Sequence, residues 1–407
     1  MSSSRFVLEE PIAFLRWLAA ARQAGWASFD DVEVAQVFAV AATAALGRHD
    51  GRERLVLPPA SATGAARFAH AIGLDEVLEG DSAREPAEHD RTVTMTRIRS
   101  YGQAESLARK IVGLLLPTRP ATDAATLFWW VLVELLRNVV QHSMDPAGGI
   151  ACAQRNDSGP YAGSPALQVV VVDNGIGVFE AIRRTQPAVL TPAQALVRAL
   201  EPHVSGTFAE GHSGTVHNAG LGLFFISEMA KRTRGRLFLA TRGATYLLDR
   251  SRSPSTQPTV TNGQSADYPG TLVVFETALD QVGSYDEIVT GIQELAASRT
   301  PQRIVHRWLR FEQPPAAVAR VLVEVAAEDT TAAHEFSSQH LEPKLLRRES
   351  VALDFVNLRV CTQSFLHALL HESVRLAWAR KVPMYVVNAT PTIRRQLEFV
   401  EGYSLGG

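Results

Sequence analysis

Few features of secreted, membrane-bound or nucleic-acid-binding proteins occur in this sequence. Its 407 residues include only two cysteines, so neither a disulfide framework nor a cysteine-based metal site is expected. The longest apolar run, Leu127 to Val133, is far shorter than the roughly 20 residues of a membrane-spanning helix. The first residues lack the basic and apolar regions of a secretory signal. A net charge of −2 gives no sign of a nucleic-acid or acidic-membrane surface, so we expect a cytoplasmic protein that binds neither.

The composition that remains is that of an ordinary globular protein. Hydrophobic residues make up 46% of the chain and charged residues 20%, and the length predicts two or three domains. Periodicity and turn residues predict an α/β fold in four parts. These are an α/β module over 1–90, a central domain over 91–280, a helical connector over 281–318 and a C-terminal α/β domain over 319–407.

Apolar residues at helical spacing predict a helix over 127–143. Glu134 and Asn138 lie four residues apart, so they share one face of that helix, and His142 continues the row. A buried polar side chain without a partner costs about 1–3 kcal/mol, so an acid and an amide in apolar surroundings indicate partners or function. The alternative is the polar stripe of an amphipathic helix.

The run from Leu167 to Val172 predicts a buried strand, after an expected loop over 148–164. It ends in Asp173-Asn174-Gly175-Ile176-Gly177. Asn-Gly between apolar runs is also typical of a hairpin turn. The residues after Gly177 have helical periodicity instead, so a carboxylate beside two glycines favours recognition of a ligand edge.

Two further glycine motifs follow. The composition of 187–217 is that of a mobile lid. Gly220-Leu221-Gly222 then opens a predicted helix over 223–232, whose N-terminus would favour a phosphate. Strands are expected at 236–240 and 244–248, a polar loop covers 251–269, and Gly270-Thr271 begins a strand over 272–276.

The order of these four motifs resembles the GHKL ATPases, which include gyrase, heat-shock chaperone, histidine-kinase and mismatch-repair ATP-binding domains. The resemblance covers about residues 92–280. It implies a Bergerat-type α/β sandwich that binds ATP and Mg²⁺. The chain has no Gly-Lys dipeptide, which excludes a phosphate loop of Walker type.

The resemblance also implies a role for each motif. Asn138 would hold Mg²⁺, Asp173 would accept the exocyclic amine of adenine, and Thr271 would assist through water. Gly175 and Gly177 would allow the backbone to approach the base closely. Gly220 and Gly222, with Leu221 between them, would allow the lid to close over the phosphates. Glu134 stands where hydrolysing members polarise the attacking water.

One departure from the pattern bears on the reaction. Many histidine kinases have a basic residue three positions after the asparagine, where this chain has Gln141. His142 and Ser143 are more similar to the anti-sigma serine-kinase branch. No histidine next to an acidic residue lies in a recognisable dimerisation-helix pattern, which disfavours a conventional histidine kinase.

The C-terminal part resembles a STAS-like domain. Strands are predicted over 351–355 and 384–387, and helices over 365–380 and 393–400. Thr362 and Ser364 lie where serine-switched relatives are phosphorylated, although one of them is expected simply to cap the helix. The order of elements in the first 80 residues suggests a second, degenerate STAS-like module.

Together these observations predict a cytoplasmic regulator that binds Mg-ATP and hydrolyses it, with Glu134 as the base. Two alternatives stay open: an anti-sigma-type serine/threonine kinase acting on a STAS-like domain, and a sensor that does not hydrolyse its nucleotide. A protein partner is expected, and a homodimer is compatible with the sequence.

Overall fold

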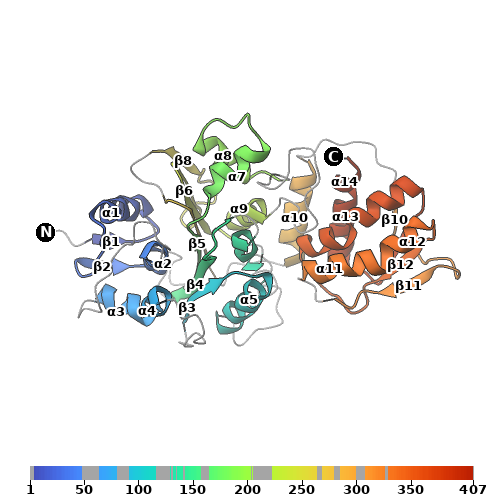
Figure 1. Ribbon diagram of the computed structural model, residues 1–407, viewed down its shortest axis with the longest axis horizontal. Coiled ribbons are helices and arrows are strands. Elements are labelled where there is room, and N and C mark those ends of the chain that lie inside the picture. The colour runs from blue at the N-terminus through green and yellow to red at the C-terminus, as the bar shows by residue number, and fades with distance from the viewer. Residues whose placement is uncertain are drawn as a thin grey trace. The chain divides into compact units, whose positions relative to one another are not determined.

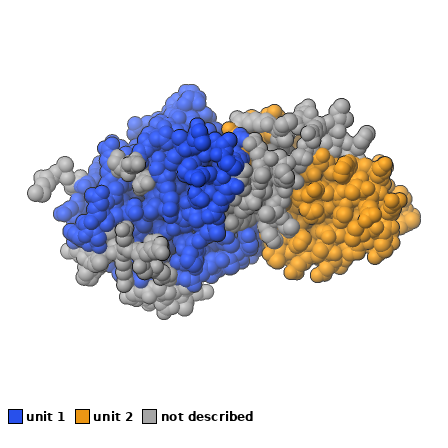
Figure 2. Space-filling view, turned by 45° about the horizontal axis from the view of Figure 1, so that its top comes forward, with its two compact units in different colours: residues 1–200, 223–283 blue, residues 201–222, 284–407 orange. Residues whose placement is uncertain are grey.

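The chain forms two compact units in the computed structural model (Figures 1 and 2). Unit 1 comprises residues 1–200 and 223–283, and unit 2 comprises 201–222 and 284–407. The structure describes residues 4–47, 64–79, 91–115, 129, 132–133, 135–140, 143–156, 165–202, 204, 222–263, 268–278, 285–298, 308–325 and 329–406. Both units contain helices and strands, so the fold is mixed α/β, as expected.

A seven-stranded sheet forms the centre of unit 1. Its order is β3-β4-β5-β9-β6-β7-β8, and each neighbouring pair is antiparallel. β5 is buried along its whole length, as its run of valines requires, since β-branched side chains pack well on a pleated surface. The strands are β3 (Thr92–Ile98), β4 (Gly149–Asn156), β5 (Ala166–Asp173), β6 (Arg236–Thr241), β7 (Ala244–Asp249), β8 (Thr259–Asn262) and β9 (Thr271–Ala278).

Three segments expected as loops contain regular structure. The prediction of a loop over 148–164 was wrong for its first half, because β4 pairs with β3 on one side and β5 on the other. The segment predicted as a lid, 187–217, contains α8 (Pro192–Ala199), whose N-terminus is stabilised by a capping box between Thr191 and Gln194. The expected loop over 251–269 contains the edge strand β8.

The N-terminal residues form a layer on one face of this sheet. Strands β1 (Ser4–Phe6) and β2 (Val32–Ala35) pair in parallel. Every residue of α2 is buried, and α2 packs against β4 and β5. Its small alanines allow this close approach, so N-terminal residues and sheet residues share one core. The helices of this layer are α1 (Pro11–Ala24), α2 (Val37–Gly47), α3 (Gly64–Ala71) and α4 (Leu74–Glu79).

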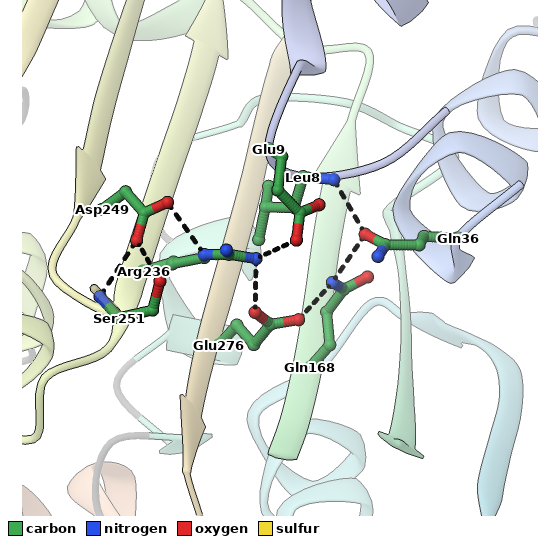
Figure 3. Close-up of polar contacts among 8 residues, drawn as sticks. All are labelled: Leu8, Glu9, Gln36, Gln168, Arg236, Asp249, Ser251 and Glu276. Atoms are coloured by element: carbon green, nitrogen blue, oxygen red, sulfur yellow. Dashed lines mark hydrogen bonds and ion pairs between the residues drawn. The ribbon is translucent and has the colours of Figure 1, made fainter. Parts of the chain in front are cut away.

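A buried ionic cluster joins this layer to the sheet (Figure 3). Arg236 on β6 is completely buried, and its Nη1 lies 2.9 Å from Glu9 Oε1 and 3.2 Å from Glu276 Oε1. Its Nε lies 3.1 Å from Asp249 Oδ2. Burial raises the pKa of Glu276, and the positive charge of Arg236 opposes that rise. Because a buried charge without a partner is expensive, these contacts define where Glu9 sits on the sheet.

The opposite face of the sheet carries other helices. In Figure 1 the sheet lies between α1–α4 and the pair α5 (Tyr101–Leu115) and α9 (Gly222–Arg232). Residues 129, 132–133 and 135–140 are also helical, and we call them the Asn138 helix. A Cβ on Gly149 of β4 would lie 2.6 Å from Val139 Cγ1, while the next residue, Ile150, belongs to the N-terminal core. The Asn138 helix therefore packs on the face turned away from α2.

Unit 2 is built on a parallel sheet of order β10-β13-β12-β11. The predicted strands near 351 and 384 and the helices that follow them are confirmed. Between α11 and α12 the chain forms a π-helical turn, Ser337–Leu341, just before Pro343, which has no N–H to donate within a helix. The elements are β10 (Leu309–Arg310), β11 (Ala319–Leu322), β12 (Val351–Asp354), β13 (Met384–Val387), α10 (Tyr285–Ser298), α11 (Thr330–Phe336), α12 (Glu342–Leu346), α13 (Gln363–Arg380) and α14 (Pro391–Gly406).

Two sequence-based expectations can be compared with these units. The border expected at residue 90 falls inside unit 1, where the N-terminal layer and the sheet share a core. Across the described ranges, no helix is both long enough and apolar enough to cross a membrane.

Candidate functional site

Two of the motif residues are direct neighbours at the ends of two central strands of the sheet. Asp173 ends β5 and is paired with Thr271, the first residue of β9. Thr271 is in turn paired with Thr241, the last residue of β6. Since Val170 and Val172 face α2 and side chains alternate along a strand, Asp173 lies on the same face as the Asn138 helix. Residues almost 100 positions apart in sequence thus meet beside one helical layer.

Asp173 is a buried carboxyl with an unusual proton affinity. The residue is only 6% exposed, and its Oδ1 accepts a hydrogen bond of 2.8 Å from the N–H of Gly175. Burial raises the pKa of Asp173 to about 7, and the charge of Asp145 adds to the rise. The N–H groups of Gly175 and Thr271 and the charge of Arg242 act in the other direction. A carboxyl near half ionisation at neutral pH is a common property of functional sites.

The loop after Asp173 is packed directly against the segment that follows the Asn138 helix. The N–H of Ile176 donates to Ser143 O at 2.9 Å. A Cβ on Gly175 would overlap this same carbonyl oxygen, and a Cβ on Gly270 would overlap Asp173 O. Glycine is therefore required at both positions by the packing of the chain itself. The structure thus explains the glycine at position 175 by the packing against Ser143, and not by the expected close approach of a base.

The remaining predicted residues fall in different places. Asn138 is half-buried, and its Nδ2 is buried without a hydrogen-bond partner among the described residues. Gly177 begins α7 (Gly177–Thr185) with φ 75°, beside Thr241. Gly222 is the first residue of α9. Five residues discussed from the sequence lie outside the described residues, namely Glu134, Gln141, His142, Gly220 and Leu221.

Asn174 and Asp145 hold the same loop, although sequence reasoning assigned neither of them a role. Asp145 Oδ2 accepts from the N–H of Asn174 at 3.0 Å. Asn174 Nδ2 donates to Ala45 O at 2.7 Å, and Tyr268 Oη donates to Asn174 Oδ1 at 2.8 Å. The loop is thus fastened to the C-terminal end of α2 in the N-terminal layer. The Asn-Gly dipeptide is typical of a turn, which was only the alternative interpretation of the sequence, and it could not reveal these partners.

Arg242 is a further residue that sequence reasoning missed. It lies in the two-residue turn between β6 and β7, where Thr241 and Ala244 form the closing pair. Its Nη2 donates to Gly175 O at 3.0 Å, and its Nε donates to Pro269 O. The Arg-Gly dipeptide between two strands is a turn signal, and nothing local predicts these two partners.

A small pocket lies beside Asp173. Its volume of about 20 Å³ suffices for about one water molecule, whereas sites for small molecules have roughly 300–1,000 Å³. The lining residues are Ala45, Asp145, Ala147, Gly148, Ile150, Val172, Asp173 and Asn174. This pocket is therefore too small for a nucleotide.

The described residues offer only a partial metal site. Within them, no group of three or more His, Cys, Asp or Glu side chains could hold a metal ion. Mg²⁺ usually keeps several waters and takes few protein ligands together with substrate phosphates. The amide of Asn138, with its unused hydrogen-bonding capacity, fits the role of one such ligand.

The two predicted phosphoacceptors lie at the start of α13 in unit 2. Thr362 is its N-cap: Oγ1 accepts from the N–H of Phe365 at 3.0 Å, and the residue is fully buried. Ser364 is 5% exposed. The structure therefore accounts for Thr362 as a cap. Phosphorylation of either hydroxyl stays a prediction and would require this helix start to open.

Comparison with known protein families, with curated proteins and with solved structures found no match for this chain.

Proposed function

We propose that unit 1 binds an adenine nucleotide with Mg²⁺ in a site of GHKL type, and that the protein is a cytoplasmic regulator controlled by this nucleotide. One observation carries the proposal. The strand end at Asp173, the strand start at Thr271 and the segment after the Asn138 helix converge at one edge of the sheet. Two motifs and the segment that follows a third, all separate in sequence, are thus neighbours in space, which supports a shared ligand.

Asp173 is suited to recognise adenine. Adenine presents an exocyclic amine as a hydrogen-bond donor, while guanine presents a carbonyl oxygen at the corresponding place. A buried carboxylate accepts from the first and repels the second. Thr271 is paired with Asp173, so its hydroxyl lies on the same strand edge and can complete the contact through a water.

Asn138 would supply an oxygen ligand for Mg²⁺. When bound, Mg²⁺ neutralises charge on the phosphates of the nucleotide. The fit rests on the half-buried amide whose Nδ2 has no partner among the described residues. A side-chain amide can exchange its oxygen and nitrogen by rotation, so this position can present an oxygen.

The reaction belongs to the proposal as well. Glu134 precedes Asn138 by one helical turn in sequence, and we propose that it orients a water for hydrolysis of ATP. Incubation with γ-labelled ATP distinguishes the three possible outcomes. Free labelled phosphate supports an ATPase, labelled protein indicates a kinase, and neither above background indicates a nucleotide sensor. A protein partner and a homodimer stay predictions.

Calorimetric titration with ATP and GTP tests the binding site itself. The loss of a buried, charge-assisted hydrogen bond costs about 1.5–3 kcal/mol, so Asp173→Asn is expected to weaken ATP binding about 10- to 150-fold. Asp354→Asn is the matched control, because Asp354 also ends a strand and accepts from an N–H two residues later, at 3.1 Å from Val356. GTP is expected to bind far more weakly than ATP. Unchanged ATP affinity in folded Asp173→Asn would rule out the assignment.

A further inference from the structure

Arg242 lies outside every sequence motif, yet it joins two segments that carry motif residues. Its Nη2 donates to Gly175 O at 3.0 Å, and its Nε donates to Pro269 O. Gly175 follows Asp173 by two positions, and Pro269 precedes Thr271 by two. One guanidinium therefore ties together the loop after β5 and the loop before β9.

The stem of this side chain is held too. A Cβ on Gly177 would lie 3.3 Å from Arg242 Cγ and 3.4 Å from its Cδ, so the stem runs closely past the start of α7. The charge of Arg242 also lowers the pKa of Asp173, against the larger effect of burial. The side chain thus has fixed contacts along its length although it begins in an exposed turn.

We propose that Arg242 is a positioning residue of the adenine site: it holds Asp173 and Thr271 in register for the base without contacting the nucleotide. This inference rests on the proposed function. Arginine suits the task because its planar guanidinium presents several donors in fixed directions. Lysine has one ammonium on a flexible stem and cannot donate to both carbonyls in the same geometry.

The first test measures affinity for ATP, ADP and adenosine in the full chain. Arg242→Gln is expected to weaken all three about tenfold, the effect of losing one charge-assisted hydrogen bond. Arg242→Lys restores only part of the loss. Arg250→Gln is the matched control, since Arg250 follows the other end of β7 and its Nε donates to Thr256 O at 3.3 Å. It is expected to bind like the parent.

A loss confined to ATP and ADP would overturn the proposal, because it would mean that Arg242 contacts phosphate directly. Equal affinity of Arg242→Gln and the parent for all three ligands would also overturn it.

The second test needs no nucleotide. Hydrogen–deuterium exchange, read by mass spectrometry, is expected to be faster in Arg242→Gln for peptides covering 173–177 and 268–271, and unchanged in Arg250→Gln. Unchanged exchange in both peptides refutes the positioning role of Arg242, whatever the affinities are. If the parent binds none of the three ligands, the proposed function fails. The positioning role then fails with it, even if faster exchange in Arg242→Gln shows that Arg242 holds the two loops.

Discussion

Replacing Asp173 by asparagine should stabilise unit 1 at neutral and alkaline pH while it weakens nucleotide binding. The amide of Asp173→Asn has nearly the shape of the carboxyl group and keeps an oxygen that can accept from Gly175. The amide carries no charge, so its burial avoids the cost of removing a charged carboxylate from water. A residue whose replacement improves stability and impairs binding serves function at a cost in stability.

The magnitude follows from the pKa of Asp173. Burial is the main cause that raises this pKa from 3.8 to about 7. The folded chain therefore binds the proton more tightly than the unfolded chain between these values. The contribution of Asp173 to stability is fully present below pH 3.8 and is lost as pH rises to about 7. At about 1.4 kcal/mol per pH unit, the loss amounts to about 4 kcal/mol above pH 7.

The two cysteines provide an assay for unit 1 alone. Cys152 lies buried in β4, and burial raises the pKa of its thiol, so it reacts with thiol reagents only after unit 1 opens. Cys361 lies in unit 2 and would be replaced by alanine. The labelling rate of Cys152 in increasing urea, divided by the rate in the fully unfolded chain at the same pH, gives the unfolded fraction.

At pH 8 the Asp173→Asn variant is expected to be about 2–4 kcal/mol more stable than the parent, and the difference should shrink steadily toward pH 4. Asp354→Asn, which changes unit 2, should leave the labelling of Cys152 unaltered. The reasoning is refuted if Asp173→Asn is less stable than the parent at pH 8, or if the difference does not vary between pH 5 and pH 8.

Three further predictions address the metal, the reaction and the N-terminal layer. Asn138→Ala should flatten the dependence of ATP affinity on Mg²⁺ concentration, and an unchanged Mg²⁺ titration would remove the metal role. Glu134→Ala should abolish phosphate release while ATP affinity stays within a few-fold, because the interaction matters mainly in the transition state; equally slow release by parent and variant would contradict hydrolysis. Arg236→Met should destabilise unit 1 by about 3–5 kcal/mol in the Cys152 assay, since Glu276 and Glu9 lose their counter-charge. That loss should diminish as pH falls and the carboxylates are protonated, and a loss independent of pH would speak against the ionic explanation.

Local sequence patterns were sufficient for much of unit 1. The strands predicted over 236–240 and 244–248 match β6 and β7 to within one residue. The apolar run before Asp173 gave a buried strand, and the helical periodicity after Gly177 correctly decided against a hairpin. These features depend on neighbours a few residues away, so periodicity and turn residues carry the information.

The main error of the sequence-based prediction, the loop over 148–164, also has a physical cause. β4 begins at Gly149 and is followed by a segment rich in turn residues, so composition favoured a loop over 148–164. Its strand conformation depends on two partners, β3 and β5, which come from elsewhere in the chain. Small side chains such as Ala151 and Cys152 fit there because both faces of β4 are covered.

The sequence by itself determined the chemistry of the candidate site: which residues carry a carboxylate, an amide or a glycine, and in which order. Only the tertiary structure decided what these residues meet. It placed Ser143 O against Gly175, fastened Asn174 to the end of α2, and brought Arg242 to the carbonyls of two loops. Each contact joins segments tens of residues apart or more, through sheet pairing and helix packing that no local pattern encodes.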